Sequence, residues 1–504
     1  MSRLQHVIFL YSFSFLIIAS QSRLPARKLW NRQLRKRSVQ PNIVLLITDD
    51  QDIMLGSMKF MTKTVRILQN GGAEFVNGFV TTPICCPSRS SLLTGLLVHN
   101  HNVNSNRKNC SGVHWQKLHE TTSVAALLQQ HGYLTGYFGK YLNGYRGHYV
   151  PAGFDEWSGL IRNSRYYNYS INYNGRIMYH GDNYAEDYLT DRIVNDSLSF
   201  WRRAKRRNPR KPIFMILSFP APHGPEDPAP QYNHWFPNET SHRTPSWNYA
   251  PNPDKQWLLK HTGKMEPVHV AFTDFLHRRR LQTLLSVDDA VQKLYQELRE
   301  LHDLHNTYVF YTSDHGYHLG QYGLVKGKNM PYEFDLKVPF LVRGPGIPRR
   351  TRIWRAVANI DIAPTILDIA GAPVPSYIDG ESFLPLLKYE KQLSLGNENA
   401  VPPTWREALL IERQRSYDDL KLERIRRRFE KQKTQFTKEL RIQKECNRRR
   451  SKRSDNAKPC SLTENNDDAN LNLDDFLTEE EIGISEEQMD AWEDEFYQEI
   501  LEVI

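Results

Sequence analysis

The sequence predicts an α/β protein with three layers, α/β/α, built around a mostly parallel central sheet. Apolar, β-branched runs end in polar residues, and segments of helical periodicity separate these runs along the chain. Such runs are typical of strands that are buried on both faces of a parallel sheet. Strands that alternate with helices place helices on both faces of that sheet.

Strands are predicted over residues 43–47, 212–218 and 307–312. Polar side chains follow these strands in the chain, namely Asp49 and Asp50, His223, and Asp314 and His315. Longer patterns, with apolar residues at spacings of three and four, predict helices over 187–201 and 272–301. Because ligands of open α/β sheets bind outside the carboxyl ends of the strands, we expect the polar side chains to converge there.

The two ends of the chain differ in composition from this α/β part. A charged start and an apolar run over 7–19 predict a signal peptide over 1–22, followed by a basic leader over 23–40. The leader is interpreted as a spacer, with a processing site after Arg37 as the alternative. The other segments are a predicted folded domain over 41–390, a basic hydrophilic segment over 391–462 and an acidic, partly disordered tail over 463–504. Residues 404–453 are predicted to form a basic helix, charged on every face, that does not pack into a core.

These features predict passage through the endoplasmic reticulum and Golgi apparatus to the cell surface or the extracellular space. Sequons of the Asn-x-Ser/Thr type support this, and they lie at Asn109, Asn168, Asn195 and Asn238. No later stretch approaches the roughly twenty apolar residues that span a bilayer, so no transmembrane segment is expected. The odd number of cysteines leaves one thiol to be explained, and Cys446 with Cys460 could close a small loop.

Two polar pairs at strand ends form the candidate metal site: Asp49 with Asp50, and Asp314 with His315. A hard cation with oxygen ligands would neutralise three carboxylates that otherwise repel one another. Calcium is the predicted ion, because zinc usually has several histidine or thiolate ligands, and this site offers one histidine and no assigned thiolate. A single pair of aspartates after a strand more often caps a turn, so the prediction depends on the second pair.

The run from Cys85 to Gly95 predicts a short helix whose N-terminus points at Cys85. Pro87 suits the first turn of a helix, and Gly95 suits the position after its end. Amide donors and the positive end of the helix dipole favour an anion there, and Arg89 adds a planar cation for sulfate or phosphate oxygens. These residues alone predict an oxyanion-binding cysteine site, and a phosphatase stays open.

The same run resembles the signature of the sulfatase family, Cys-x-Pro-Ser-Arg-x-x-x-Leu-Thr-Gly, at every fixed position. The resemblance implies an alkaline-phosphatase/sulfatase-like fold. It also implies that the formylglycine-generating enzyme converts Cys85 to formylglycine in the endoplasmic reticulum, whereas Cys86 occupies a free position and is not modified. In the implied mechanism the hydrated aldehyde attacks sulfur, forms a covalent sulfate ester and then expels sulfate through its second hydroxyl.

Further matches to the family surround Lys140, His223 and Lys328. By resemblance, the calcium ligands would be Asp49, Asp50, the modified Cys85, Asp314 and His315. The groups in contact with the sulfate or the leaving oxygen would be Arg89, Lys140, His223 and Lys328. Either His223 or Lys328 would donate the proton to the departing sugar hydroxyl.

One difference from the general sulfatase pattern indicates a particular branch of the family. Many sulfatases have the motif Gly-Lys-x-His, whereas this chain has Leu142 in place of the histidine. This variant, together with Ser286-Val287-Asp288-Asp289, is similar to the branch that acts on glucosamine 6-sulfate. Over roughly residues 41–390 the chain resembles the extracellular heparan-sulfate 6-O-endosulfatases. The resemblance implies an enzyme that removes 6-O-sulfates within heparan sulfate. An exo-acting N-acetylglucosamine-6-sulfatase and a non-catalytic heparan-sulfate-binding protein are the alternatives.

The segments after the predicted domain bear on partners and activity. The basic segment resembles the hydrophilic region of the endosulfatases, so heparan sulfate proteoglycans are the predicted partners, captured as polyanions by counterion release. Nucleic acid is not expected, because the chain is predicted to be secreted. Sulfatases end in a smaller C-terminal subdomain, which the tail over 463–504 does not resemble, and the non-catalytic alternative rests on that departure.

Overall fold

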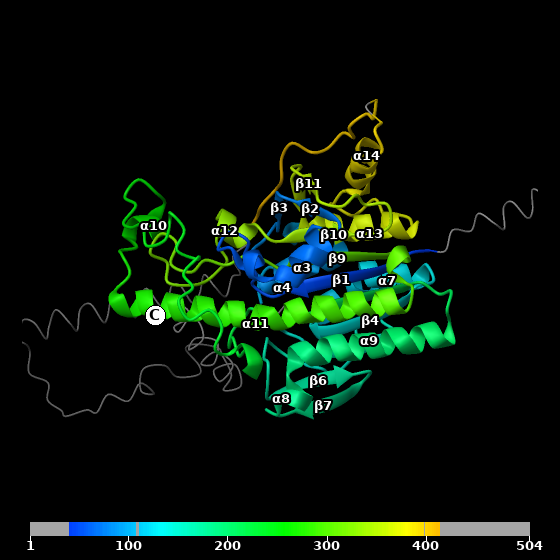
Figure 1. Ribbon diagram of the computed structural model, residues 1–504, viewed down its shortest axis with the longest axis horizontal. Helices are drawn as coiled ribbons and strands as arrows, with labels where there is room; N and C mark the ends of the chain where they lie inside the picture. Colours follow the sequence, from blue (N-terminus) through cyan, green and yellow to red (C-terminus); the bar gives the residue numbers. More distant parts are fainter. Residues whose placement is uncertain (1–39, 107–109, 398, 414–504) are drawn as a thin grey trace, which may run out of the picture.

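The computed structural model describes residues 40–106, 110–397 and 399–413 (Figure 1). At its centre, strand β1 (Asn42–Thr48) lies between β8 (Ile213–Ser218) and β9 (Thr307–Ser313), parallel to both. The ten-stranded sheet has the order β11-β2-β10-β9-β1-β8-β4-β5-β6-β7. The prediction of a mostly parallel central sheet is confirmed, and the three predicted strands lie at its middle.

The other strands extend the sheet on both sides. They are β2 (Ala73–Phe75), β4 (Leu134–Lys140), β5 (Glu156–Leu160), β6 (Tyr169–Tyr173), β7 (Arg176–His180), β10 (Phe340–Arg343) and β11 (Thr351–Ile353). Parallel pairing runs from β9 through β1, β8 and β4 to β5, whereas β10, β6 and β7 pair antiparallel with their neighbours. A separate pair of short strands joins β3 (Gly78–Phe79) to β12 (Val357–Ala358).

Helices cover both faces of this sheet, as predicted. Alternate residues of β1 enter two different cores: Ile43 and Leu45 pack with α7 (Val124–Gln130) and α13 (Ile362–Ala370), whereas Val44 packs with α9 and α11. Because side chains of a strand alternate between its faces, this division shows that β1 is buried on both. Figure 1 shows α9 (Leu189–Arg207) and α11 (Pro267–Glu300) running side by side.

The predicted helices exist, with shifted ends. Helix α9 continues past the predicted residue 201, because Lys205, Arg206 and Arg207 favour the negative end of its dipole. Helix α11 begins before the predicted residue 272, at Pro267, since proline suits the first turn. The remaining helices are α3 (Thr62–Thr64), α4 (Cys85–Thr94), α5 (Val98–His101), α6 (Val113–Leu118), α8 (Tyr184–Asp187), α10 (Trp257–His261), α12 (Glu333–Leu336) and α14 (Leu384–Ser394).

The prediction of a helix from residue 404 is wrong for the part that the structure describes, because residues 404–413 contain no helix. Trp405 is buried in the core, and its indole N–H donates to the Ala356 carbonyl at 2.7 Å. The apolar ring of Trp405 therefore ties this charged segment to the fold.

Other predictions fall partly outside the described residues. The signal peptide, the leader up to residue 39, Asn109, Cys446 with Cys460, the rest of the basic segment and the acidic tail all lie there. The sequon residues that the structure describes, Asn168, Asn195 and Asn238, are exposed. Within the described ranges, no helix combines the length and apolar content that crossing a bilayer requires. The domain boundary at residue 390 stays a prediction.

Candidate active site

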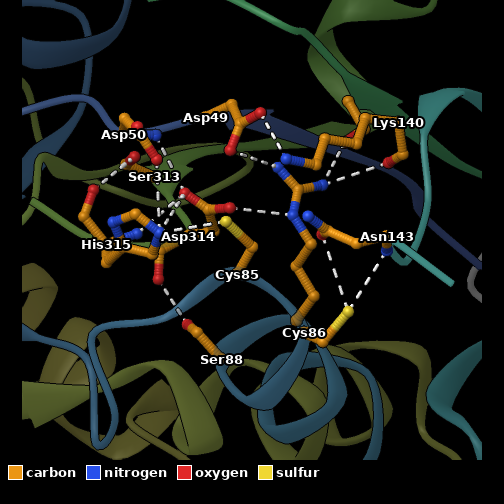
Figure 2. A network of polar contacts seen from close by, with 12 residues as sticks. Asp49, Asp50, Cys85, Cys86, Ser88, Lys140, Asn143, Ser313, Asp314 and His315 are labelled. Carbon is orange, nitrogen blue, oxygen red and sulfur yellow. Dashed lines mark hydrogen bonds and ion pairs between the residues drawn. The ribbon is translucent and has the colours of Figure 1, made fainter. Parts of the chain in front are cut away.

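The polar residues that follow the central strands meet at the carboxyl ends of these strands, as predicted (Figure 2). Thr48 and Ser313 are register partners at the ends of β1 and β9, so the residues after them are neighbours. The Asp50 N–H donates to the Asp314 carboxylate at 3.0 Å. His223 follows β8 and lies close enough to Asp49, Asp50 and Cys85 for their ligand atoms to share one ion.

Cys85 is the first residue of α4 and is fully buried. Its Sγ lies 3.4 Å from His315 Nε2 and 3.5 Å from Lys328 Nζ. At the other end of the helix Gly95 has φ 72°, a left-handed conformation that favours glycine, and its N–H donates to Ser91 O. The predicted helix, its direction and its glycine end are therefore confirmed.

Side chains of α4 fix this helix to the end of β9. The Ser88 hydroxyl donates to the Asp314 carbonyl and accepts from Asn359 Nδ2 at 3.0 Å. Arg89 Nε donates to Asp314 Oδ2 at 2.8 Å, and Nη1 donates to the Ser218 hydroxyl at 2.7 Å. The guanidinium is thus held by groups from β8 and β9. Asn359 and Ser218 were not predicted, because neither lies in a motif near Cys85 in the sequence.

The adjacent cysteine has a different role. Cys86 forms a disulfide with Cys110, and Cys85 is the free cysteine among the described residues. The Asn143 N–H also donates to Cys86 Sγ at 3.1 Å. This pairing was not predicted, although Cys110 is the remaining cysteine within the predicted domain over 41–390 and elimination could have found it.

Two lysines pair with the buried carboxylates of Asp49 and Asp50. Lys140 Nζ lies 2.6 Å from Asp49 Oδ2, and Lys328 Nζ lies 2.8 and 2.9 Å from the two oxygens of Asp50. Burial would raise the pKa of Asp49, but the charge of Lys140 and the other cations holds it well below its usual range. Burial would likewise raise the pKa of Asp50, but the combined charges of Lys328, His223 and His315 lower it. Both carboxylates are therefore ionised at neutral pH.

Lys140 reaches this site because of the glycine before it. Gly139 has φ 103°, and a Cβ at this position would lie 2.0 Å from the Ser218 carbonyl. Glycine therefore allows β4 to approach β8 closely while its last side chain turns inward. At the position of the family histidine, Leu142 is fully buried in the core. The site thus has an apolar residue there.

The two histidines of the site differ in charge. Burial, followed by the nearby Lys328 ammonium, lowers the pKa of His223 to about 4. Burial also opposes the charge on His315, but Asp314 and Asp50 outweigh it and raise the pKa of His315 to about 9. Each ring uses Nδ1 to contact the carbonyl of the next residue, Gly224 at 2.8 Å and Gly316 at 2.9 Å. If Nδ1 carries the proton, Nε2 of neutral His223 is free to accept.

The donor set fits a hard cation. Two overlapping groups have ligand atoms within 4.8 Å of one another, Asp49 with Cys85, Asp314 and His315, and Asp49 with Asp50, Cys85 and His223. Asp49 Oδ1 is buried and accepts no hydrogen bond from the described residues, its cationic neighbour being Arg89 Nη2 at 3.5 Å. A buried carboxylate oxygen without a donor is suited to a metal ion. His223 was not among the predicted ligands.

Three polar residues around Asp49 and Lys140 were not found from the sequence. Ser164 donates to Asp49 Oδ2, and Asn163 Oδ1 accepts from Lys140 Nζ at 3.0 Å. Asn143 Nδ2 also donates to Asn163 Oδ1, at 3.2 Å. Asn143 directly follows the position of the Gly-Lys-x-His motif at residues 139–142, whereas Asn163 and Ser164 lie in the loop after β5, which carries no motif, and the fold reveals that all three lie at the site.

The last described residues lie beside the loops that carry Cys85 and Lys328. The Glu412 N–H donates to Thr81 O at 2.9 Å, and its carbonyl accepts from the Thr82 hydroxyl at 2.7 Å. The Glu412 carboxylate contacts His99 Nδ1 at 2.9 Å, and Arg413 Nε donates to Asn329 Oδ1. Residues 412–413 therefore connect the segment before α4 to the residue that follows Lys328.

The site and fold have clear relatives among known proteins. A sequence model of the sulfatase family matches residues 41–372. A Sulf-1 homolog of Caenorhabditis elegans, named as an extracellular sulfatase, is 56% identical over 414 residues, covering 82% of this chain and 58% of its own length. N-acetylglucosamine-6-sulfatase of Capra hircus is 44% identical over 391 residues, covering 75% of this chain and 67% of the goat protein.

Solved structures support the same assignment. The structure titled BT4656 in complex with its substrate D-glucosamine-2-N,6-O-disulfate superposes with a TM-score of 0.59 at 25% identity. The match covers 73% of this chain and 83% of that one. This chain thus spans less than two thirds of the nematode relative while matching most of the solved enzyme. Together with the signature helix at Cys85, these matches show that the chain belongs to the sulfatase family.

Proposed function

We propose that the protein is a secreted, calcium-dependent sulfoesterase that hydrolyses 6-O-sulfate esters of glucosamine units within heparan sulfate. The observation that carries the proposal is the position of Cys85, at the N-terminus of α4 and beside His315 and Lys328. Conversion of Cys85 to formylglycine during secretion, by the formylglycine-generating enzyme, would give the site its nucleophile.

The charges around Cys85 support a sulfate site. A bound calcium, held by Asp49, Asp50, Asp314, His315 and the modified Cys85, would neutralise the carboxylates and polarise a sulfate oxygen. The positive end of the α4 dipole faces Cys85 and favours an anion, although Pro87 has no N–H and the Cys86 N–H already donates to Asn106 Oδ1 at 2.9 Å. Lys140 and Arg89 are buried and fixed by hydrogen bonds, so they are oriented before any substrate arrives.

Lys328 is the better candidate for protonating the leaving sugar oxygen. Its ammonium lies 3.5 Å from Cys85 Sγ, and the side chain is partly exposed, unlike the fully buried Lys140. Burial and Lys328 keep the pKa of His223 at about 4, so His223 is neutral at pH 7 and acts as an acceptor. His223 would then orient the substrate or the attacking hydroxyl.

The relatives support glucosamine 6-sulfate as the substrate class. One relative is named N-acetylglucosamine-6-sulfatase, and the solved enzyme BT4656 holds D-glucosamine-2-N,6-O-disulfate as its substrate. The nematode relative is a Sulf-1 homolog, named as an extracellular sulfatase, which supports action outside the cell. Because this chain spans 58% of that relative, action on the interior of a polymer belongs to the proposal.

Heparan sulfate proteoglycans are the proposed partners. Within the basic segment over 391–462, Arg413 contacts Asn329, next to Lys328, so the described part of the segment reaches the rim of the site. A polycation at this position would hold a sulfated chain close to the nucleophile through counterion release. The exposed sequon residues Asn168, Asn195 and Asn238 support secretion and glycosylation.

Mass spectrometry of secreted protein tests the nucleophile. After reduction, the tryptic peptide over residues 67–89 contains both Cys85 and Cys86, so Cys86 serves as the internal control. We expect Cys85 to have exchanged its thiol for an aldehyde while Cys86 keeps its thiol. Two unmodified cysteines in this peptide would refute the enzyme assignment and leave a non-catalytic heparan-sulfate-binding protein.

Sulfate release from heparan sulfate oligosaccharides tests the substrate. We expect loss of 6-O-sulfate from interior glucosamines, with a chain carrying Cys85→Ala as the blank. Release confined to the non-reducing end would favour the exo-acting alternative, which the goat N-acetylglucosamine-6-sulfatase supports. Hydrolysis of phosphate esters with sulfate esters untouched would contradict both.

A further inference from the structure

Three consecutive arginines lie on helix α11, and they differ in burial. Arg278 and Arg279 are partly exposed and bond to the loop over 233–237, Arg278 to the Pro237 carbonyl and Arg279 to the Asn233 side chain. Arg280 is 2% exposed and is among the largest fully enclosed side chains of the described residues. A guanidinium is rarely buried without a specific set of partners, so its contacts need an explanation.

The contacts of Arg280 all lie beneath the candidate active site. Nη2 donates to the Asp50 carbonyl at 2.6 Å, and Nη1 donates to the Pro222 carbonyl at 3.2 Å. The guanidinium also stacks on the Tyr317 ring, with Cζ 3.9 Å from the ring centroid. These three partners belong to the segments after β1, β8 and β9, and each lies within two residues of Asp50, His223 or His315.

The backbone at Asp50 needs such a contact. Asp50 has φ 67°, a left-handed conformation that residues other than glycine adopt at a cost on the order of 1 kcal/mol. Its peptide is held on one side by the Asp314 carboxylate, which accepts the Asp50 N–H, and on the other by Arg280. Asp52 balances the charge of Arg280, with Oδ1 3.5 Å from Nη2. The arginine therefore fixes a strained turn that directs the Asp50 carboxylate into the site.

We propose that Arg280 is a positioning residue that holds the Asp50 turn and the His223 loop in register with Cys85. It does not touch the reacting groups, since its donors contact backbone carbonyls behind Asp50 and His223. The inference rests on the proposed function, because Asp50 and His223 acquire their roles from it. A planar fork is required, since a single ammonium cannot reach two carbonyls from different loops and stack on a ring.

The test compares Arg280→Met with Arg279→Met, which removes the neighbouring guanidinium from the same helix. Each variant is purified as the full secreted chain, and its Tm is measured in EDTA and over a calcium titration. Turnover of a fluorogenic aryl sulfate is measured in parallel. For Arg280→Met we expect the calcium concentration of half-maximal stabilisation to rise about tenfold. We also expect kcat to fall on the order of a hundredfold with KM within about twofold.

Arg279→Met should match the wild type in all three measurements. If Arg280→Met lowers the Tm in EDTA but leaves the calcium titration and kcat unchanged, the residue is only a structural brace and the inference is overturned. Arg280→Lys serves if the methionine variant is not secreted, and it should show the same two losses. Failure of both variants to be secreted, with Arg279→Met secreted normally, would assign Arg280 to folding and also overturn the inference.

The calcium titration separates this inference from the proposed function. It needs no substrate, so it can succeed even if the wild-type protein releases no 6-O-sulfate from heparan sulfate. In that case the proposed function fails, while a shifted calcium midpoint in Arg280→Met still supports the positioning role. If calcium does not stabilise the wild-type protein, Asp50 is not part of a calcium site, and the proposal that Arg280 positions Asp50 for calcium is overturned.

Discussion

Two strands of the same sheet, β1 at its centre and β7 at its edge, end in very different surroundings. All residues of β1 are buried, and it pairs on both sides with β8 and β9. Strand β7 pairs with β6, and most of its residues are exposed, Tyr179 by 82%. A histidine lies next to a carboxylate at the end of each strand. His180, the last residue of β7, lies 3.2 Å from the Asp187 carboxylate, and Asp50, which follows β1, lies 3.3 Å from His315, which follows the neighbouring β9.

The difference shows that a histidine next to a carboxylate is not enough for a site. His180 stacks on Tyr169 and meets Asp187, with no further functional group from another strand among its described partners. His315 lies beside the Asp50 carboxylate, which follows β1, and beside Cys85 of α4, and Lys328 contacts both of these residues. Parallel neighbours on both sides of β1 bring these groups together, and an edge strand has a neighbour on one side.

The largest expected effect concerns the nucleophile. Cys85→Ala should reduce turnover by about 10⁴-fold or more, because no other described side chain can replace the nucleophile that we propose to form from Cys85. Its neighbour is the matched control: Cys86→Ala breaks the disulfide with Cys110 and should lower the free energy of unfolding by about 2–4 kcal/mol while leaving measurable turnover. Aryl sulfate hydrolysis and denaturant titration measure the two outcomes. Equal activity losses in both variants would contradict this division.

Matched isoleucines test the contrast between the two strands directly. Ile43 in β1 is 0% exposed, and Ile177 in β7 is 48% exposed. Ile43→Ala should lower the free energy of unfolding by about 2–5 kcal/mol, since it leaves a cavity in the core. Ile177→Ala should change it by less than about 0.5 kcal/mol. Urea unfolding of both variants gives the comparison, and similar losses would show that β7 is covered by something that the described residues do not include.

The pH dependence of the calcium-free protein sharpens the comparison of the two histidines. The pKa of His315 is raised to about 9 in the folded state, from an ordinary value of about 6.5. Its stabilising effect is therefore fully present below pH 6.5 and is lost as the pH rises through 9, up to about 3 kcal/mol. Unfolding measured in EDTA from pH 6 to 9.5 should show this decline. His315→Gln should remove it, and His180→Gln should leave it in place.

Only a small effect is expected at the rim of the site. The His99 and Glu412 side chains are in contact at 2.9 Å, and the His99 side chain is 43% exposed. Because exposed ion pairs contribute little, Glu412→Gln should lower the free energy of unfolding by no more than about 1 kcal/mol. The Glu412 backbone bonds to Thr81 and Thr82 remain in this variant. A loss of several kcal/mol would mean that the carboxylate, rather than the backbone, holds residues 412–413 against the fold.

Much of the site could be predicted because its residues follow recognisable strands or lie in one continuous run. Asp49, Asp314 and Cys85 belong to this class. Asn359, Ser164 and Arg280 could not be predicted, because nothing local in the sequence distinguishes them from other polar residues. Arg280 is the clearest case, since two arginines of the same helix precede it and only the direction that each faces separates them.

The helical prediction for residues 404–413 failed for a related reason. Charge on every face argues against a core position for the segment as a whole, yet the Trp405 ring is buried in the core, Arg406 pairs with Asp361 at 2.6 Å, and the Glu412 backbone bonds to Thr81 and Thr82. Single residues of a charged segment thus hold it on the fold when a site for them exists. That site is formed by elements distant in the chain and is invisible in the sequence.

The sequence by itself determined the layered α/β architecture, the strands that carry the polar pairs, and the signature helix with Cys85 at its start. Periodicity and local motifs suffice for these, because they depend on which residues are neighbours along the chain. The tertiary structure alone decided which cations neutralise which carboxylates, that Cys86 pairs with Cys110, that Arg280 binds the Asp50 backbone beneath the site, and that Glu412 packs against the segment before α4. These depend on how segments distant in the chain are packed, 24 residues apart for the disulfide and 91 residues or more for the other contacts, and packing is fixed only when the whole sheet forms.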